Sequence, residues 1–429
     1  MIGGLQKTTN YRVVLPFYIY GSIGFLVGTL LLLFSTGDMG LHYFNPHVLA
    51  ITHCMALAWG TMLIFGASHQ LLPVMVEGKL SSDGLAYLSF AMVGLGIPLL
   101  IYGFYVFNLG LPLKSGAILI NLGTVCYLLN VLKTAFANNK LSNVHAWFAL
   151  TAAFWLFTTT FFGLLLVFNF QGAVLVKSSV YYLAAHAHLG IVGWFLLMVM
   201  GFGARLIPMF LISKYTSNKT LWWIYALING ALIGFLFIYL LGLAAQLYYL
   251  VWGAGALAVA LFVRYCYKAY QHRIRKSVDQ QVRTSLISVA LMVLPFVFIL
   301  ILLSSTNASL ISKIGLLYGF SIFFGWVTAI ILGMTFKTMP FIVWNKVYHN
   351  KAHSGRTPTP KELFNEGVYR CMQYAYLFGF FIFITGIFLV SQVILKLGAI
   401  LLLAAAVLYV YNMLLTVNHK PSNDGHQNK

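Results

Sequence analysis

Long apolar runs are the feature of this sequence that most constrains its fold. Twelve stretches of about 20 residues, bounded by polar or turn-forming residues, are apolar enough to cross a bilayer as helices. They cover residues 11–35, 46–74, 84–107, 113–136, 145–170, 181–212, 220–243, 246–270, 284–304, 311–343, 369–391 and 395–417. Backbone polar groups in lipid must be satisfied internally, and helices achieve this. The sequence therefore predicts an all-α integral membrane protein with twelve transmembrane helices and no soluble domain.

The composition excludes other classes of protein. A chain that is 61% hydrophobic and 8% charged is not a soluble multidomain protein. The four cysteines, Cys54, Cys126, Cys266 and Cys371, stand singly in or at the ends of apolar segments, so they predict neither a disulfide scaffold nor a zinc module. The net charge of +19 indicates attraction to membrane lipid. We expect no nucleic-acid partner.

The basic residues predict the orientation of the chain. With the N-terminus inside, only Lys114, Lys177, Lys313 and Lys396 lie outside, and the other 22 of the 26 Lys and Arg lie inside. Because Lys and Arg are retained on the cytoplasmic side, both termini, with a tail at 419–429, are predicted to be cytoplasmic. The first segment is too long for a signal-peptide core, so we expect a retained helix. The predicted location is the cytoplasmic (inner) membrane of a bacterium.

One spacing recurs in the second, sixth and tenth apolar segments. Each copy has a Trp six residues, a Gly thirteen residues and a Pro twenty residues after its first position. The copies are His53, Trp59, Gly66, Pro73; His188, Trp194, Gly201, Pro208; and Phe320, Trp326, Gly333, Pro340. A period of four helices predicts three pseudosymmetric four-helix arcs, with units 1–140, 141–280 and 281–418 inside one membrane domain, 1–429. We expect the glycines to allow close helix approach and the prolines to limit how far each helix continues.

Histidines near the outer ends of two repeat-equivalent helices are the candidate ligands. An imidazole inside a membrane needs a partner or a ligand, and His47, His53, His186 and His188 cluster there. Since His53 and His188 share one repeat position, we expect them at one depth as the two axial ligands of a low-spin heme b. Zinc usually takes more protein ligands, copper does not account for the Gly- and aromatic-rich surroundings, and hydrogen-bonded core histidines are the remaining interpretation.

The other site candidates follow from helix geometry. His186 and His188 lie about 200° apart around a helix, so His186 is a candidate ligand of a second heme. His47 lies about 9 Å above His53 on a helix and is a candidate additional ligand or propionate partner.

Two lysines and two tryptophans complete the predicted site. Lys177 and Lys396 are candidate contacts of the heme propionates, with ordinary interface cations as the alternative. Trp59 and Trp194 are expected to pack near the heme.

The stretch 186–210, HAHLGIVGWFLLMVMGFGARLIPMF, resembles the His-x-His helix of the heme-copper oxidase subunit I superfamily. The resemblance implies twelve helices in three arcs, a low-spin heme held by His188 and His53, and a high-spin heme held by His186. Similarity of architecture covers nearly the whole chain, whereas motif similarity is confined to the second and sixth helices.

The chain also departs from the family's pattern. The His-x-His pair is on the sixth helix instead of the tenth, no His-His pair follows, and Glu77, Glu362 and Glu366 are at the predicted cytoplasmic side. The resemblance is therefore to a divergent cytochrome b-like member that lacks the usual copper-site histidines.

Three functions stay open at this point. The first is electron transfer through a bis-His heme b in a respiratory or nitrogen-oxide-related pathway, with cytochrome c or quinol as redox partner and with additional subunits; an enzymatic form would be an oxidoreductase of the cytochrome oxidase or nitric oxide reductase type. The second is a non-enzymatic, nitric-oxide-responsive heme or copper membrane protein. The third is a membrane transporter, which the scarcity of intramembrane charge disfavours.

Overall fold

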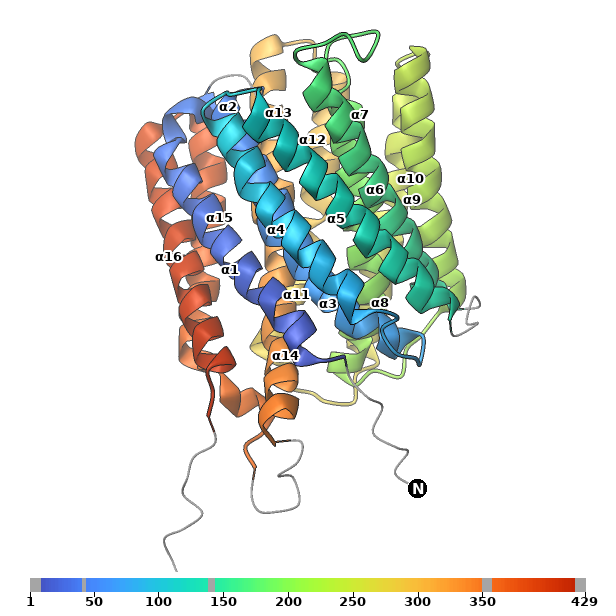
Figure 1. Ribbon diagram of the computed structural model, residues 1–429, viewed down its shortest axis with the longest axis vertical. Helices are drawn as coiled ribbons and strands as arrows, with labels where there is room; N and C mark the ends of the chain where they lie inside the picture. The colour runs from blue at the N-terminus through green and yellow to red at the C-terminus, as the bar shows by residue number, and fades with distance from the viewer. Residues whose placement is uncertain (1–8, 41–43, 138–142, 349–356, 421–429) are drawn as a thin grey trace, which may run out of the picture.

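The computed structural model describes residues 9–40, 44–137, 143–348 and 357–420, so residues 421–429 of the expected tail lie outside it. Within these ranges twelve helices are long and apolar enough to cross a membrane. The prediction of an all-α membrane protein with twelve spans is confirmed. Because the number of spans is even, the first and last spans place the two ends of the described chain at one end of the bundle (Figure 1). We call it the terminal end, and the other the opposite end.

Eight spans are single helices, and four are divided. The single helices are α1 (Tyr11–Phe34), α4 (Asp83–Tyr105), α5 (Leu111–Phe136), α6 (Val144–Asn169), α9 (Asn218–Leu241), α10 (Leu247–Gln271), α15 (Glu366–Leu389) and α16 (Gln392–Val417). The second span is α2 (Pro46–His53), η2 (Cys54–Thr61) and α3 (Met62–Met75), and the sixth is α7 (Leu183–His188), η3 (Leu189–Leu196) and α8 (Leu197–Leu211). The ninth is α11 (Gln280–Leu291) and α12 (Val293–Ser304), and the tenth is α13 (Ala308–Phe320), η4 (Ser321–Val327) and α14 (Thr328–Tyr348).

Local sequence explains several helix boundaries. Side-chain oxygens of Asn10, Asn45, Ser82 and Asn143 accept hydrogen bonds from the first turns of α1, α2, α4 and α6, which satisfies backbone N–H groups that have no partner inside the helix. The ninth span is interrupted between α11 and α12 just before Pro295, whose ring clashes with the carbonyl four residues earlier.

The second, sixth and tenth spans form the inside of the bundle. Of their most apolar windows, 78%, 78% and 83% is buried, compared with at most 50% in the other nine spans. The nine outer spans surround them, and α1 packs beside α16, which closes the ring between the first and last spans (Figure 1). α5 packs on α6, and α10 packs on α12. Each of these two contacts joins the last helix of one predicted unit to the first helix of the next.

The three inner spans share a local distortion that sequence reasoning missed. Each changes from α-helix to a π-helical segment directly after the first position of the repeated spacing, at His53, His188 and Phe320. A π-helical turn contains an extra residue and is uncommon outside functional sites. Its appearance at one position of all three spans supports the predicted repeat.

The repeated glycines lie where each inner span meets the first helix of its own unit. A Cβ atom on Gly66, Gly201 or Gly333 would lie 2.8 Å from Phe17 Cβ, 2.4 Å from Phe148 Cβ or 2.3 Å from Ser285 Oγ, respectively. Since real Cβ atoms do not approach other atoms so closely, any larger residue would push the two helices apart. The glycines therefore have the packing role that their spacing predicts.

The repeated prolines do not all limit their helices. α3 ends at Met75 and α8 at Leu211, shortly after Pro73 and Pro208, but α14 continues past Pro340 to Tyr348. The expectation is therefore wrong for the tenth span. A proline removes one backbone hydrogen bond to the preceding turn, and tertiary packing of α14 on α11 and η6 (Pro360–Leu363) supports the helix beyond it.

We expect Gly333→Ala to destabilise the protein by about 1–3 kcal/mol, because overpacking forces neighbouring atoms to move. The atoms in the way include the backbone carbonyl oxygen of Gln281, 2.6 Å from the added Cβ. Gly230→Ala is the matched control, since a Cβ there has no other atom within 4 Å. Thermal unfolding in detergent measures both variants, and equal midpoints for the two would contradict the packing role.

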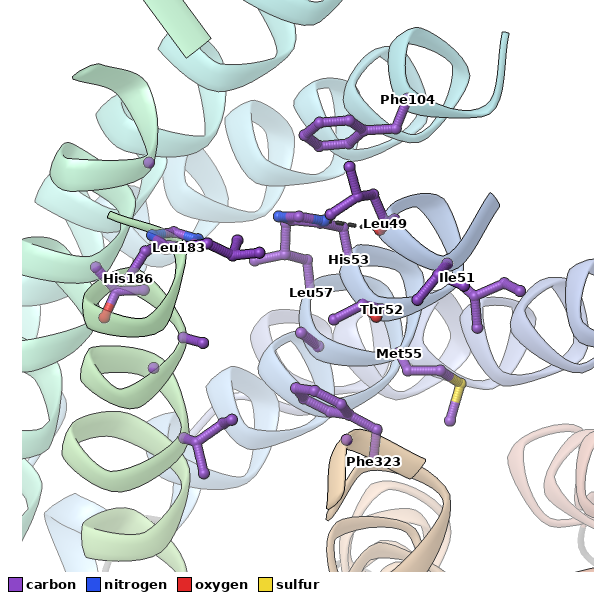
Figure 2. Close-up of a pocket in the computed structure, with 18 of the residues that line it drawn as sticks. Leu49, Ile51, Thr52, His53, Met55, Leu57, Phe104, Leu183, His186 and Phe323 are labelled. Carbon is purple, nitrogen blue, oxygen red and sulfur yellow. Dashed lines mark hydrogen bonds between the residues drawn. The ribbon is translucent and has the colours of Figure 1, made fainter. Parts of the chain in front are cut away.

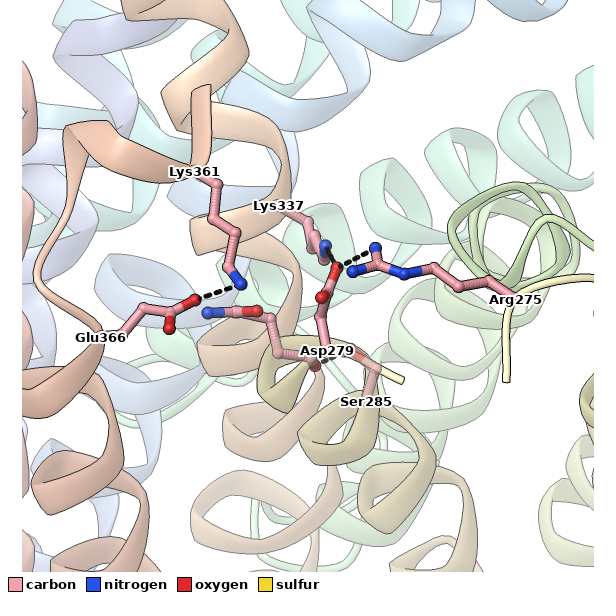
Figure 3. Close-up of polar contacts among 7 residues, drawn as sticks. Arg275, Asp279, Ser285, Lys337, Lys361 and Glu366 are labelled. Atoms are coloured by element: carbon pink, nitrogen blue, oxygen red, sulfur yellow. Dashed lines mark hydrogen bonds and ion pairs between the residues drawn. The ribbon is translucent and has the colours of Figure 1, made fainter. Parts of the chain in front are cut away.

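A cluster of ion pairs lies at the terminal end of the bundle (Figure 3). Asp279, the residue before α11, accepts hydrogen bonds from Lys337 of α14 and from Arg275 at 3.4 Å. Burial alone would raise the pKa of Asp279, but the hydrogen bond and charge of Lys337, with the charges of Arg275 and Lys361, outweigh burial and lower it. The separate pair Lys361–Glu366, at 2.8 Å, is about half exposed.

We expect Asp279→Asn to destabilise the protein by about 1–3 kcal/mol at neutral pH, since it leaves Lys337 without its carboxylate. Because folding lowers the pKa of Asp279, its stabilising effect is complete above the unfolded pKa and is lost as the pH falls through the folded one. The difference from wild type should therefore shrink only below about pH 4. The exposed-pair control Glu366→Gln should cost at most about 1 kcal/mol. A pH series of unfolding midpoints tests this, and a pH-independent difference would refute it.

Candidate functional site

A cavity of about 320 Å³ lies inside the bundle near the opposite end. This volume falls in the range of small-molecule and cofactor sites. Residues of all three inner spans line it, together with residues of α4, α5 and α6, and most of the walls are apolar or aromatic. No Asp, Glu, Lys or Arg is among the described lining residues, and the imidazoles of His53 and His186 are the only titratable groups besides the Tyr318 phenol.

His53 is held with one nitrogen free. It is the last residue of α2, and its Nδ1 lies 2.8 Å from the carbonyl oxygen of Leu49, one turn earlier. Because a carbonyl only accepts, Nδ1 carries the proton and Nε2 keeps its lone pair. The Phe104 ring of α4 stacks on the imidazole at 4.6 Å and fixes its orientation (Figure 2).

His186 of α7 lies near His53 at the wall of the cavity (Figure 2). The two ring centroids are 6.3 Å apart and the ring planes differ by 23°. Nδ1 of His186 is buried, and the backbone carbonyl of Thr159 in α6 lies beside the ring. The ring also packs against Gly163 of α6, where a Cβ would lie 2.8 Å from His186 Cε1.

His188 does not face His53, contrary to the predicted pairing. Its Nδ1 donates to the carbonyl of Ala184 at 2.8 Å, and the hydroxyl of Tyr318 donates to its Nε2 at 3.3 Å. Its ring packs on Phe235 at 4.5 Å. His188 is not among the described residues that line the cavity. The structure therefore pairs His53 with His186, not with His188.

Rotation explains why the predicted pair does not form. His53, His188 and Phe320 share one repeat position, but they lie at three different interfaces between units. At the first interface His53 meets His186, which lies two places before the repeat position of the second unit. His188 meets the corresponding residue of the third unit, Tyr318, with centroids 5.9 Å apart. Phe104 and Phe235 cover the two histidines in the same way. Two histidines can share a repeat position without sharing a site.

The third interface repeats the arrangement with apolar residues only. Phe320 occupies the position of His53 and His188, and it stacks on Phe383 of α15 at 4.6 Å. Tyr318 was missed as a site residue, although it precedes Phe320 by the same two places by which His186 precedes His188. Comparing the residues two places before each repeat position would therefore have identified Tyr318.

The distances distinguish the two histidine-containing interfaces. Two imidazoles that bind one iron on opposite faces, with metal–nitrogen bonds of about 2 Å, hold their ring centroids about 6 Å apart. The centroid distance between His53 and His186, 6.3 Å, matches this separation. Two bonds in line also need about 4 Å between the ligating atoms, so the 3.3 Å between His188 Nε2 and the Tyr318 hydroxyl leaves no room for a metal.

Three other predicted site residues lie away from this cavity. His47 Nδ1 is 2.6 Å from Asp38 Oδ2, and its ring packs on Tyr105 at 4.4 Å, so a hydrogen bond to Asp38 replaces the expected contact with a cofactor. Lys177 Nζ lies 3.7 Å from the centre of the Tyr181 ring. Lys396 is exposed near the start of α16. None of the three is among the described residues that line the cavity.

The two predicted tryptophans have different positions. Trp194 lines the cavity and donates from Nε1 to the Thr61 hydroxyl at 3.0 Å. Trp59 stacks on Phe25 at 4.5 Å and donates to Thr328 at 2.9 Å, and it is not among the described lining residues. Thr61 and Thr328 share one repeat position, where the second unit has Leu196. Indole–hydroxyl hydrogen bonds therefore join two of the three unit interfaces below the cavity.

Metal sites with several protein ligands find no support. Among the residues that the structure describes, no three or more His, Cys, Asp or Glu side chains gather in a way that would hold a metal ion. A heme is a different case, since its iron needs at most two protein ligands. No family model matches the chain, and no curated protein matches it.

We expect Thr61→Val to destabilise the protein by about 1–3 kcal/mol, since it leaves the buried indole N–H of Trp194 without an acceptor. Thr385→Val is the matched control, because that exposed hydroxyl bonds only the Phe381 carbonyl of its own helix. Unfolding midpoints in one detergent compare the two variants. An equal effect of both would show that the Trp194 hydrogen bond does not stabilise the interface.

Proposed function

We propose that the protein binds a heme b between His53 and His186 and transfers electrons through it. The observation that carries the proposal is the facing pair of imidazoles, 6.3 Å apart between ring centroids, at an apolar cavity of about 320 Å³. The free Nε2 of His53 and the imidazole of His186 would hold the iron.

The residues around the pair favour this role. The hydrogen bond from His53 Nδ1 to Leu49 fixes the tautomer and makes Nε2 a better ligand. Phe104 and Gly163 hold the two rings in place from α4 and α6. The apolar walls exclude water, which matters because the surroundings of a heme help to set its reduction potential. A bound heme would supply one-electron oxidation and reduction.

Two protein ligands also indicate the kind of activity. An iron with histidine on both faces has no open position for a substrate, so electron transfer is favoured over reduction of a gas at this site. A second heme on His186 has no support, because His186 faces His53. The copper alternative lacks a group of ligands among the described residues, and the transporter alternative lacks charged groups in the cavity wall.

The surroundings of the site limit its partners. With both termini in the cytoplasm of a bacterium, as the distribution of Lys and Arg predicts, the cavity lies in the outer half of the inner membrane. A quinol in the membrane or a cytochrome c outside it would be within reach of a heme at that depth, and further subunits would provide docking for either. The resemblance to the heme-copper oxidase superfamily implies a respiratory or nitrogen-oxide-related pathway, which we include in the proposal.

We expect purified protein from a heme-producing host to show a b-type reduced-minus-oxidised spectrum. The heme content should be about one per chain, because one interface among the described residues has two facing histidines. His53→Ala and His186→Ala should each abolish the low-spin signal, since each removes one axial ligand. The measurement is the absorption spectrum, together with heme quantification and the elution profile of each variant.

His188→Ala is the matched control, two residues from His186 on the same helix. It should keep the low-spin signal, because His188 bonds Tyr318 and lies outside the cavity. Loss of the signal in His188→Ala, with retention in His186→Ala, would instead restore the pair expected from the repeat position alone. A wild-type protein without heme would refute the proposal.

A further inference from the structure

A second cavity lies among the three inner spans, closer to the terminal end, with a volume of about 80 Å³. Its lining includes two sets of repeat-equivalent residues, fourteen and eighteen places after His53, His188 and Phe320. These sets are Ala67, Phe202 and Met334, and Leu71, Leu206 and Thr338. Because all three units contribute from the same positions, the cavity lies on the axis that relates them. We call it the axial chamber.

The axial chamber is separate from the site of His53 and His186. Along the second span, Thr61 lines the outer cavity, whereas Leu63 and Ile64 line the axial chamber. The hydrogen bonds from Trp194 to Thr61 and from Trp59 to Thr328 lie at the level between the two. Neither His53 nor His186 lines the chamber, so its occupancy does not depend on a bound heme.

The chemistry of the chamber wall excludes most occupants. Its volume exceeds the roughly 10–15 Å³ that one water molecule needs, but a stable buried water also needs two to four polar partners. The hydroxyls in the wall, Tyr18, Thr335 and Thr338, already bond protein groups: Tyr18 with Thr338 at 3.0 Å, and Thr335 with Tyr409 at 3.1 Å. The remaining lining residues are Leu, Ile, Val, Met, Phe, Ala and Gly. A charged or strongly polar ligand would find no partner there.

We infer that the axial chamber binds a small, neutral, apolar molecule of the size of a noble-gas atom or a diatomic gas. Apolar cavities of comparable construction stay dry and accept xenon or small hydrocarbons. The chamber lies among three helices that glycines hold close to the outer ring. It gives the protein a binding site for dissolved gas that is distinct from the histidine pair.

Xenon is the probe that tests the inference. Crystals of the full-length protein are pressurised with xenon, and anomalous diffraction locates the bound atoms. We expect a xenon atom between Ala67, Phe202 and Met334. Ala67→Phe should abolish this peak by filling the space, whereas Ala91→Phe, on the exposed face of α4, should leave it unchanged. Ala67→Leu is the milder filling variant if the phenylalanine prevents folding.

The wild-type and filling-variant crystals together decide the outcome. A xenon peak in the chamber that the filling variants remove supports the inference. Ordered water or a lipid acyl chain in the chamber would overturn it, and so would an empty chamber in crystals that take up xenon elsewhere.

Discussion

The contact between a glycine of each inner helix and the first helix of its own unit determines the position of nearly everything else. Gly66, Gly201 and Gly333 bring the inner spans against Phe17, Phe148 and Ser285, closer than any side chain would permit. In lipid there is little hydrophobic force between helices, so close van der Waals packing of this kind is a principal source of association. It gathers the three inner spans on one axis, and both cavities lie between those spans.

Much of the fold followed from the sequence, because its signals are local and periodic. Each of the twelve apolar runs required a spanning helix, and the Trp, Gly and Pro spacing predicted a period of four helices. The spacing did not predict that the three spans that carry it lie inside the bundle. The π-helical segments after His53, His188 and Phe320 were not predictable, since no residue type in a membrane helix requires a π turn. Nor was the extension of α14 past Pro340, which depends on the packing of α14 against distant segments.

The site was predicted in its residues but not in its pairing. The histidine cluster on the second and sixth spans was visible from composition and depth alone. The partner of each ring depends on the rotation between units, which a linear pattern does not contain. His47 illustrates the same limit, since its hydrogen bond with Asp38 brings together a short loop helix and the start of α2. Tyr318 would have been found by comparing the residue two places before each repeat position.

The three interfaces amount to a comparison series within one chain. Helix direction, depth and the π turn are shared. The facing residues are two imidazoles at the first interface and an imidazole and a phenol at the second. At the third, the repeat position is the apolar Phe320, which Phe383 covers as Phe104 and Phe235 cover the histidines. Differences in behaviour among the three interfaces would therefore come from their side chains, because the surrounding helices are the same. In evolutionary terms, a triplicated scaffold can retain a ligand pair at one interface while the other two interfaces diverge. This is possible because the glycines that stabilise the fold are different residues from those that face each other at the interfaces.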